Sequence, residues 1–140
     1  VREKIKTGEP LKKLEKYIEA CSGDISVMSD YSILTRGTAI FELKSWKNGY
    51  INNIKAEEVG KSSMILGAGR EKKDDLINYG VGIYFEKKSG DFVKENETLC
   101  RIYYEEKSHL EKCMILLKSA YEISDKINPK KEIIVDLRGF

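Results

Sequence analysis

The sequence predicts an α+β fold, and three observations support that prediction. Apolar residues recur at helical spacing in separate segments, apolar and polar residues alternate in several short segments, and glycine or asparagine marks many of the boundaries. The 140 residues fit one domain of ordinary size, which is long enough to bury a core.

The first predicted element is an amphipathic helix over residues 11–21. Pro10 stands in a first-turn position, and Gly23 follows the last apolar residue as the expected stop. Residues 24–36 mix Ser, Asp and isolated apolar side chains without a period. We therefore expect an irregular connection there and place a boundary near Thr35.

Alternating residues predict short strands after this boundary. Residues 38–44 alternate, and Asn48-Gly49 supplies a turn into residues 50–54, so we expect these two strands to form a hairpin. Further strands are predicted at residues 81–85, 100–104 and 132–137.

Two helices are predicted between these strands. Residues 56–66 form a short helix with acidic residues in its first turn and Gly67 as its left-handed stop. The fully charged run at residues 70–75 that follows is expected to be a solvated loop. Ser108 and Glu111 form a capping box that begins a second helix. Its predicted buried stripe comprises Leu110, Cys113, Met114, Leu117 and Tyr121.

Composition excludes several classes of function. With 25 Lys and Arg against 23 Asp and Glu, the net charge is only +2, so we expect no nucleic-acid partner. No apolar run approaches the roughly 20 residues of a membrane helix, so we expect no membrane partner. Three cysteines without CxxC spacing favour thiols in a reducing cytoplasm. The first residue is Val1, which suggests a segment of a longer protein, although removal of an initiator Met or of a tag would leave the same end.

The sequence offers no clear catalytic, metal or cofactor site. His109, the one histidine, falls in the first turn of a helix without a second ligand nearby, and we interpret it as a solvent-exposed residue. Cys113 lies on an apolar stripe and is expected in the core. Gly67 and Gly69 form a GxG, but it follows a helix instead of a strand, which argues against dinucleotide binding.

Two alternative functions stay open. The segment Gly90-Asp91-Phe92-Val93-Lys94 and the later Glu105-Glu106-Lys107 are similar to the lysine-bearing region of biotinyl and lipoyl carrier domains. A carrier lysine needs an exposed turn between two strands, whereas Lys107 leads directly into the predicted helix. The other alternative is a stand-alone interaction module.

Several motifs together resemble the C-terminal domain of pyrimidine-nucleoside phosphorylases, the family that includes thymidine phosphorylase. The resemblance covers nearly the whole chain and departs from the family's usual residues at Ser22, where glycine is usual, and at Lys55, where an acidic residue is common. The matching segments are the helix 11–21 with Ser22-Gly23-Asp24, residues 45–57, Leu66-Gly67-Ala68-Gly69-Arg70, Val81-Gly82-Ile83 and Gly90-Asp91-Phe92-Val93.

The resemblance implies a fold and a division of the chain. The implied fold is an α/β-hammerhead with a barrel-sandwich-like β unit related to biotinyl and lipoyl domains, plus an N-terminal helix. Residues 1–35 would be a helical connecting segment from the preceding domain, and residues 36–140 the phosphorylase C-terminal α+β domain.

The resemblance also implies a reaction whose chemistry lies elsewhere. Members of the family convert a pyrimidine nucleoside and phosphate into free base and pentose 1-phosphate. In the family, the substrates phosphate and pyrimidine nucleoside bind mainly in earlier domains. The isolated segment is therefore expected to be inactive, without catalytic, metal or cofactor residues. The implied partners are those missing N-terminal domains of the same chain, and the complete enzyme would be a cytoplasmic homodimer.

The implied contribution of this segment is domain closure. The family's corresponding loop faces the cleft between domains, and here the loop 66–75 contains Gly67, Gly69 and Arg70. We expect these three residues to help close the cleft over substrate. The alternative is that the glycines only end the helix and that Arg70 pairs with a surface carboxylate.

Overall fold

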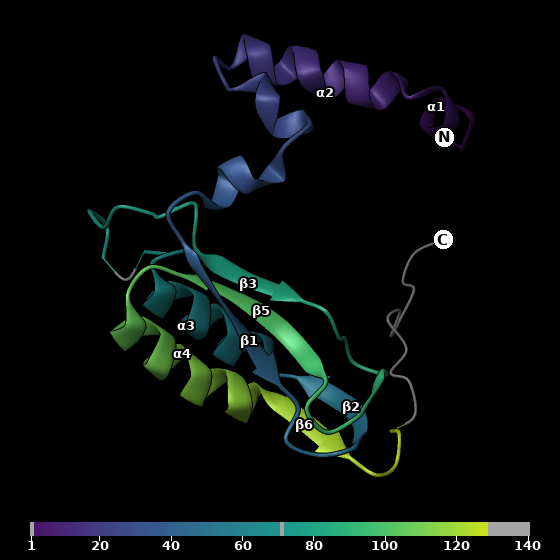
Figure 1. Ribbon diagram of the computed structural model, residues 1–140, viewed down its shortest axis with the longest axis vertical. Helices are drawn as coiled ribbons and strands as arrows, with labels where there is room; N and C mark the ends of the chain where they lie inside the picture. The colour runs from purple at the N-terminus through teal and green to yellow at the C-terminus, as the bar shows by residue number, and fades with distance from the viewer. Residues whose placement is uncertain (1, 71, 129–140) are drawn as a thin grey trace, which may run out of the picture. The chain divides into compact units, whose positions relative to one another are not determined.

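The computed structural model describes residues 2–70 and 72–128, which fall into two compact units (Figure 1). The first unit is Val1–Arg36 and the second is Gly37–Phe140. The strand predicted at residues 132–137 lies outside the described residues.

All the regular elements described in the first unit are helices. It contains α1 (Arg2–Thr7), α2 (Glu9–Ala20) and two 3-10 helices, η1 (Ile25–Met28) and η2 (Tyr31–Thr35). The helix predicted at residues 11–21 is therefore confirmed as α2, and it begins two residues earlier. None of the residues in these four helices is buried.

Aspartate caps order the connection that the sequence predicted to be irregular. The side chains of Asp24 and Asp30 accept hydrogen bonds from the backbone N–H groups of Ser26 and Ser32, both at 2.9 Å. These bonds begin η1 and η2. The bonds to Ser26 and Ser32 also lower the pKa of both carboxyl groups, because they stabilise the ionised form.

The second unit contains two antiparallel three-stranded sheets. In one, β5 (Thr98–Tyr104) lies between β1 (Ala39–Lys44) and β3 (Gly82–Phe85). In the other, β2 (Gly49–Ile54) lies between β4 (Phe92–Val93) and β6 (Tyr121–Ser124). Two strands were not predicted: β4, which has only two residues, and β6, whose first residue, Tyr121, was assigned to the preceding helix.

The predicted hairpin of residues 38–44 and 50–54 is wrong, because β1 and β2 belong to different sheets. After β1 the chain continues beside residues 96 and 97. The Ser45 N–H donates to the Glu97 carbonyl at 2.8 Å, and the Asn96 N–H donates to the Ser45 carbonyl at 2.8 Å. These bonds occupy the Ser45 backbone groups that would have paired with the second strand of a hairpin.

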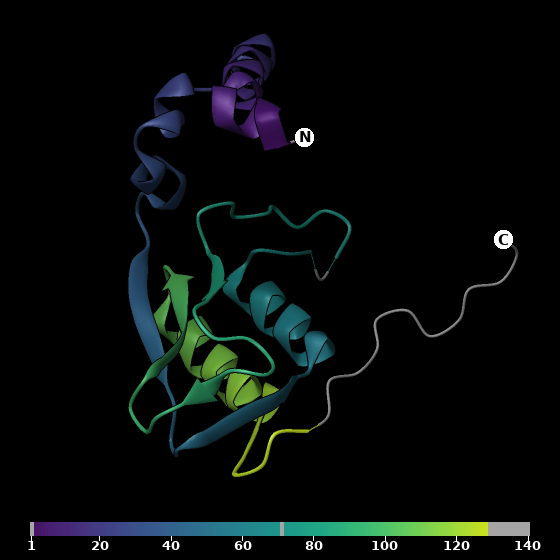
Figure 2. The same cartoon turned by 90° about the vertical axis from the view of Figure 1, so that its right-hand side faces the viewer.

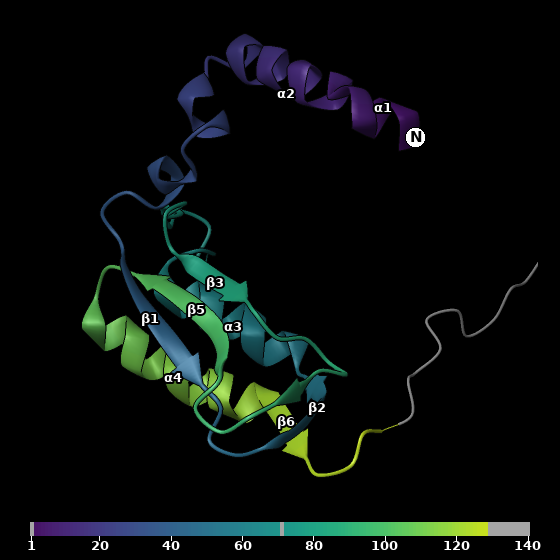
Figure 3. The same ribbon diagram turned by 45° about the vertical axis from the view of Figure 1, so that its right-hand side comes forward.

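Helices α3 (Ala56–Leu66) and α4 (Lys107–Ala120) pack against each other on one face of the β1–β5–β3 sheet (Figures 2 and 3). The α3 bounds confirm the prediction. The capping box is wrong: Glu106 is the N-cap, no side chain caps α4, and Ser108 is already its second residue. Tyr121 is buried as predicted, but it begins β6.

The core lies between the helix pair and the sheets. Cys113 and Leu117 from α4 are fully buried, as are Ile102 from β5 and Ile51 from β2. The helix stripe predicted around Leu110 is thus largely confirmed, with Met114 only half-buried at its edge. No helix among residues 2–70 and 72–128 has the length and apolar character needed to cross a bilayer.

Candidate functional site

The candidate site begins where α3 ends. Gly67 has φ 99°, in the left-handed region that glycine adopts without steric cost. The Gly67 N–H donates to the Met64 carbonyl at 2.9 Å, and the Ala68 N–H donates to the Ser63 carbonyl at 3.0 Å. This pair of bonds is a Schellman motif, which satisfies the last helical carbonyls and directs the chain away from α3.

The loop after α3 returns to the point where it began. The Asn78 N–H donates to the Gly67 carbonyl at 2.9 Å, so the base of the loop is closed by a backbone hydrogen bond. Within the loop, the Lys72 N–H donates to a side-chain oxygen of Asp75 at 2.7 Å. Leu76 projects into solvent with 94% of its surface exposed.

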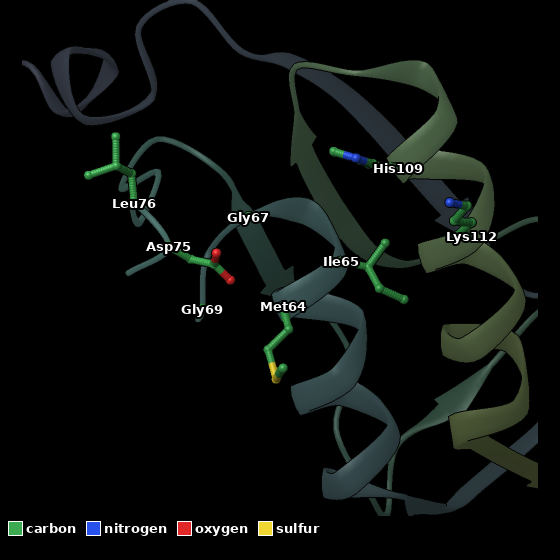
Figure 4. A pocket seen from close by; sticks show the side chains of 8 residues that line it. All are labelled: Met64, Ile65, Gly67, Gly69, Asp75, Leu76, His109 and Lys112. Carbon is green, nitrogen blue, oxygen red and sulfur yellow. The ribbon is translucent and has the colours of Figure 1, made fainter. Parts of the chain in front are cut away.

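A surface pocket of about 410 Å³ opens beside this loop, between the end of α3 and the start of α4 (Figure 4). Apolar side chains of α3 and the loop, two glycines and three charged or titratable side chains line it. These residues are Met64, Ile65, Gly67, Gly69, Asp75, Leu76, His109 and Lys112.

The polar side of the pocket comes mainly from α4. His109 and Lys112 are three residues apart, so they lie on the same helix face. The His109 Nε2 atom lies 3.8 Å from a Glu106 side-chain oxygen, which is close enough for an ion pair when the imidazole is protonated. Asp75 contributes a carboxylate from the opposite side. Such a mixed-charge lining suits polar contacts with a loop or ligand.

Of the three residues predicted to take part in closure, Gly67, Gly69 and Arg70, only the two glycines line the pocket. Gly67 and Gly69 both line the pocket, whereas Arg70 is exposed and is not part of the lining. Among the residues described, none forms an ion pair with Arg70. A Cβ on Gly69 would lie 2.8 Å from the Met64 Cγ atom, so the glycine lets the loop pass close to α3.

His109 and Lys112 line the pocket although neither is predicted to belong to a site. His109 lies in the first turn of α4, as predicted, but it is half-buried in the pocket and not a solvent-exposed residue. The spacing of the two residues was a visible signal. The spacing does not show which helix lies next to that face. His109 and Lys112 line a pocket only because α3 packs against α4.

The buried thiols are unsuited to nucleophilic chemistry. Cys100 and Cys113 are fully buried, and burial raises the pKa of Cys100 to about 11 and of Cys113 to about 12. A thiolate is the reactive form of cysteine, so both thiols stay unreactive near neutral pH. Cys113 therefore belongs to the core, as predicted.

Metal and carrier chemistry also find no support in the described part of the chain. Within residues 2–70 and 72–128, no group of three or more His, Cys, Asp or Glu side chains could hold a metal ion. Lys107 is the first residue of α4, whereas a carrier lysine needs the exposed turn of a hairpin. The structural context of the carrier motif is therefore absent at Lys107.

Comparison with known proteins identifies the family. Residues 50–124 match the model of the pyrimidine nucleoside phosphorylase C-terminal domain. The chain belongs to this family. That match includes α3, the loop, the pocket and α4, so the candidate site lies inside the pyrimidine nucleoside phosphorylase C-terminal domain.

Curated relatives carry the same family name. The chain is 40% identical over 103 residues to a pyrimidine-nucleoside phosphorylase of Staphylococcus haemolyticus, which covers 74% of the chain and 24% of that relative. It is 40% identical over 99 residues to the Geobacillus stearothermophilus protein, covering 71% and 23%. For the Bacillus subtilis protein the identity is 35% over 103 residues, covering 74% and 24%. The chain thus spans about a quarter of the length of these relatives.

Proposed function

We propose that this chain is the C-terminal domain of a pyrimidine-nucleoside phosphorylase and that it takes part in domain closure. The enzyme would convert a pyrimidine nucleoside and phosphate into free base and pentose 1-phosphate. The observation that carries the proposal is the family match over residues 50–124, together with the names of the relatives. Phosphate and nucleoside would bind mainly in the domains that precede this one.

The loop that begins at Gly67 is suited to a closing element. Its base is held by the hydrogen bond between Gly67 and Asn78. Arg70, Lys72 and Lys73 are exposed along the loop. An arginine without an ion-pair partner in the described structure is available to contact an anionic group when the domains approach. Arg70 therefore acts in closure, whereas Gly67 and Gly69 shape the turn.

The test is the Arg70→Ala substitution in the complete enzyme that carries this chain. We expect kcat/KM for phosphorolysis to fall roughly tenfold or more, the loss that follows removal of a hydrogen bond to a charged group. Lys73→Ala is the matched control, because Lys73 is an exposed cation of the same loop. The melting temperature of both variants should equal that of the parent protein, because both side chains are exposed.

Two results would contradict the proposal at different levels. Unchanged kinetics in Arg70→Ala, or an equal loss in Lys73→Ala, would remove the closure role of Arg70. A complete protein without phosphorolysis of any pyrimidine nucleoside would remove the enzymatic assignment. The 140-residue chain by itself should be inactive, and measurable turnover by it would show that catalytic residues lie within it.

The finer fold and domain assignments belong to the same proposal. Residues 1–35 would connect to a preceding domain, and residues 36–140 would form the hammerhead domain with its barrel-sandwich-like β unit. The α+β content and the two antiparallel sheets support the hammerhead arrangement. A crystal structure of the complete enzyme would test both assignments.

The assembly and location of the enzyme are proposed on the family resemblance. The complete enzyme would be a homodimer whose contacts lie chiefly in the missing N-terminal helices, which sedimentation of the complete and the 140-residue proteins would test. Cytoplasmic location stays a prediction from cysteine usage, with Cys21, Cys100 and Cys113 all free.

A further inference from the structure

A hydrogen-bonded turn follows Arg70 in the loop after α3. The Asp75 N–H donates to the Lys72 carbonyl at 3.1 Å, which is the closing bond of a β-turn over residues 72–75. In return, the Lys72 N–H donates to the Asp75 Oδ2 atom at 2.7 Å. Two hydrogen bonds thus join the ends of the turn, and the one to the carboxylate is charge-assisted.

The same pair of bonds occurs at two other turns of the second unit. Lys88 and Asp91 form the side-chain bond at 2.7 Å and the backbone bond at 3.1 Å. Lys94 and Glu97 form them at 2.9 Å and 3.1 Å. These two turns lie on either side of β4 and hold the tight connections to its neighbours. The turn at residues 72–75 is therefore built in the way that this chain uses to fix connections.

The chain is held on both sides of Arg70. Before Arg70, the Gly69 backbone lies against α3, since a Cβ on Gly69 would stand 2.8 Å from the Met64 Cγ atom. After Arg70, the turn begins two residues later. Asp75 and Gly69 line the same pocket, so the outgoing and returning parts of the loop lie close together (Figure 4). Arg70 thus stands between two anchored segments.

We propose that Asp75 is a positioning residue for phosphorolysis. Its carboxylate fixes the turn at residues 72–75, and the fixed turn limits the directions that Arg70 takes when the domains close. The inference rests on the proposed function, which assigns closure to Arg70. Asp75 acts through Arg70 and does not itself touch substrate.

The advantage of a preformed turn is entropic. Loop residues lose conformational freedom when they form a contact with another domain, and that loss weakens the contact. A turn that exists before closure removes part of the loss. Lys73 and Asp74 are exposed at the centre of the turn, whereas the Asp75 side chain supplies a bond that holds it. The effect therefore belongs to Asp75 and not to the charge of the loop in general.

Kinetics of the complete enzyme test the inference with three substitutions. Asp75→Ala should lower kcat/KM roughly threefold to tenfold, because the hydrogen bond to the carboxylate is lost. Asp75→Asn keeps an acceptor oxygen and should restore kcat/KM to within about twofold of the parent value. Asp74→Ala is the matched control. It removes the neighbouring exposed carboxylate and should also stay within about twofold.

A double-mutant cycle with Arg70→Ala separates positioning from a merely structural role. If Asp75 acts through Arg70, Asp75→Ala causes no further loss in the Arg70→Ala background. A loss by the same factor in both backgrounds would overturn the inference, because the effect would then not pass through Arg70. Equal losses in Asp75→Ala and Asp75→Asn would also overturn it, since the charge and not the acceptor oxygen would then be responsible.

Trypsin provides a readout that does not depend on activity. It cleaves after Lys and Arg, and the exposed Lys72 and Lys73 lie within the turn. Cleavage of the complete enzyme at these two residues should be at least about threefold faster in Asp75→Ala than in Asp75→Asn, because local opening governs the rate and both variants lack the same charge. Equal cleavage rates in the two variants would overturn the inference.

This inference and the proposed function fail in different ways. Unchanged kcat/KM in Asp75→Ala, together with a loss in Arg70→Ala, contradicts this inference alone. Unchanged kinetics in Arg70→Ala contradicts the closure role, and the positioning of Arg70 by Asp75 is then wrong as well.

Discussion

Gly49 lies directly against the backbone of Ser124. A Cβ at position 49 would stand 2.8 Å from the Ser124 carbonyl oxygen and 2.9 Å from the Cγ2 atom of Ile123. Gly49 also adopts φ 151°, which side chains of L-residues rarely occupy. The absent side chain thus allows β2 and β6 to approach each other across residues distant in the sequence.

Gly49→Ala should destabilise the second unit. The added methyl group meets a backbone oxygen that cannot move without disturbing β6, so we expect a loss of about 2 kcal/mol or more in the free energy of unfolding. Gly82→Ala is the control, because a Cβ there meets nothing within 4 Å. Thermal unfolding followed by circular dichroism measures both. Equal melting temperatures for the two variants would contradict the close packing at Gly49.

Alanine at Gly67 and at Gly60 should change stability in opposite directions. Gly67→Ala forces a side chain into the left-handed region and should cost roughly 1–2 kcal/mol. Gly60 lies within α3 in open space, so Gly60→Ala should stabilise by about 0.5–1 kcal/mol through helix propensity. Denaturant unfolding of the two variants tests this pair. Stabilisation by Gly67→Ala would show that the helix does not end as described.

Leu117 and Ile115 provide a matched test of the core on one helix. Leu117 is fully buried, whereas Ile115 is 71% exposed. Leu117→Ala should cost about 2–5 kcal/mol because it removes buried methyl groups and leaves a cavity. Ile115→Ala should stay within about 0.5 kcal/mol of the parent. Similar losses in the two variants would mean that the described face of α4 is not the buried one.

The three thiols should differ in their reaction with a thiol reagent. Cys21 is exposed, whereas Cys100 and Cys113 are buried with raised pKa values. At pH 8 we expect rapid labelling of Cys21 in the native chain, and labelling of the other two only after denaturation. Mass spectrometry of the labelled peptides identifies the sites. Rapid native labelling of Cys113 would contradict its place in the core.

Stability should decline at alkaline pH because of these buried thiols. Burial raises the pKa of Cys100 to about 11 and of Cys113 to about 12, from an ordinary value of 9.0. Above pH 9.0 the folded chain therefore keeps protons that the unfolded chain releases. The free energy of unfolding should fall with rising pH by at most about 1.4 kcal/mol per pH unit for each thiol.

Cysteine variants separate the buried thiols from other alkaline effects. Cys113→Ala should weaken the decline between pH 9.0 and about 12, because one buried acid is removed. Cys21→Ala should leave the decline unchanged, since Cys21 is exposed. Denaturant midpoints measured across this pH range provide the test, and a stability that rises with pH would contradict the assigned direction of both shifts.

Local signals account for the elements that were predicted correctly. The α3 bounds follow from acidic residues in the first turn and from Gly67 as the stop. The buried face of α4 follows from the spacing of Leu110, Cys113 and Leu117. In each case the deciding interactions lie within a few turns of one helix, so the sequence contains them directly.

Non-local pairing accounts for the wrong hairpin, whereas the wrong capping box is a local error. Asn48 and Gly49 resemble a hairpin turn, yet the backbone bonds of Ser45 to residues 96 and 97 separate the strands into two sheets. Ser108 and Glu111 satisfy the capping-box pattern, yet α4 begins at Lys107. No pattern within a short window contains residues 96 and 97, which decided the strand pairing. The start of α4 is a local outcome, and the capping-box pattern placed its N-cap two residues after Glu106.

The sequence by itself determined the α+β class, the helices α2, α3 and α4, and the family of the chain, because helical spacing, caps and ordered motifs are local properties. Only the tertiary structure decided that His109 and Lys112 face Gly67 and Gly69 in one pocket. It also decided that Arg70 stands outside that pocket. The physical reason is that a pocket wall is made by the packing of α3 against α4, and the residues that meet there are some forty positions apart in the chain.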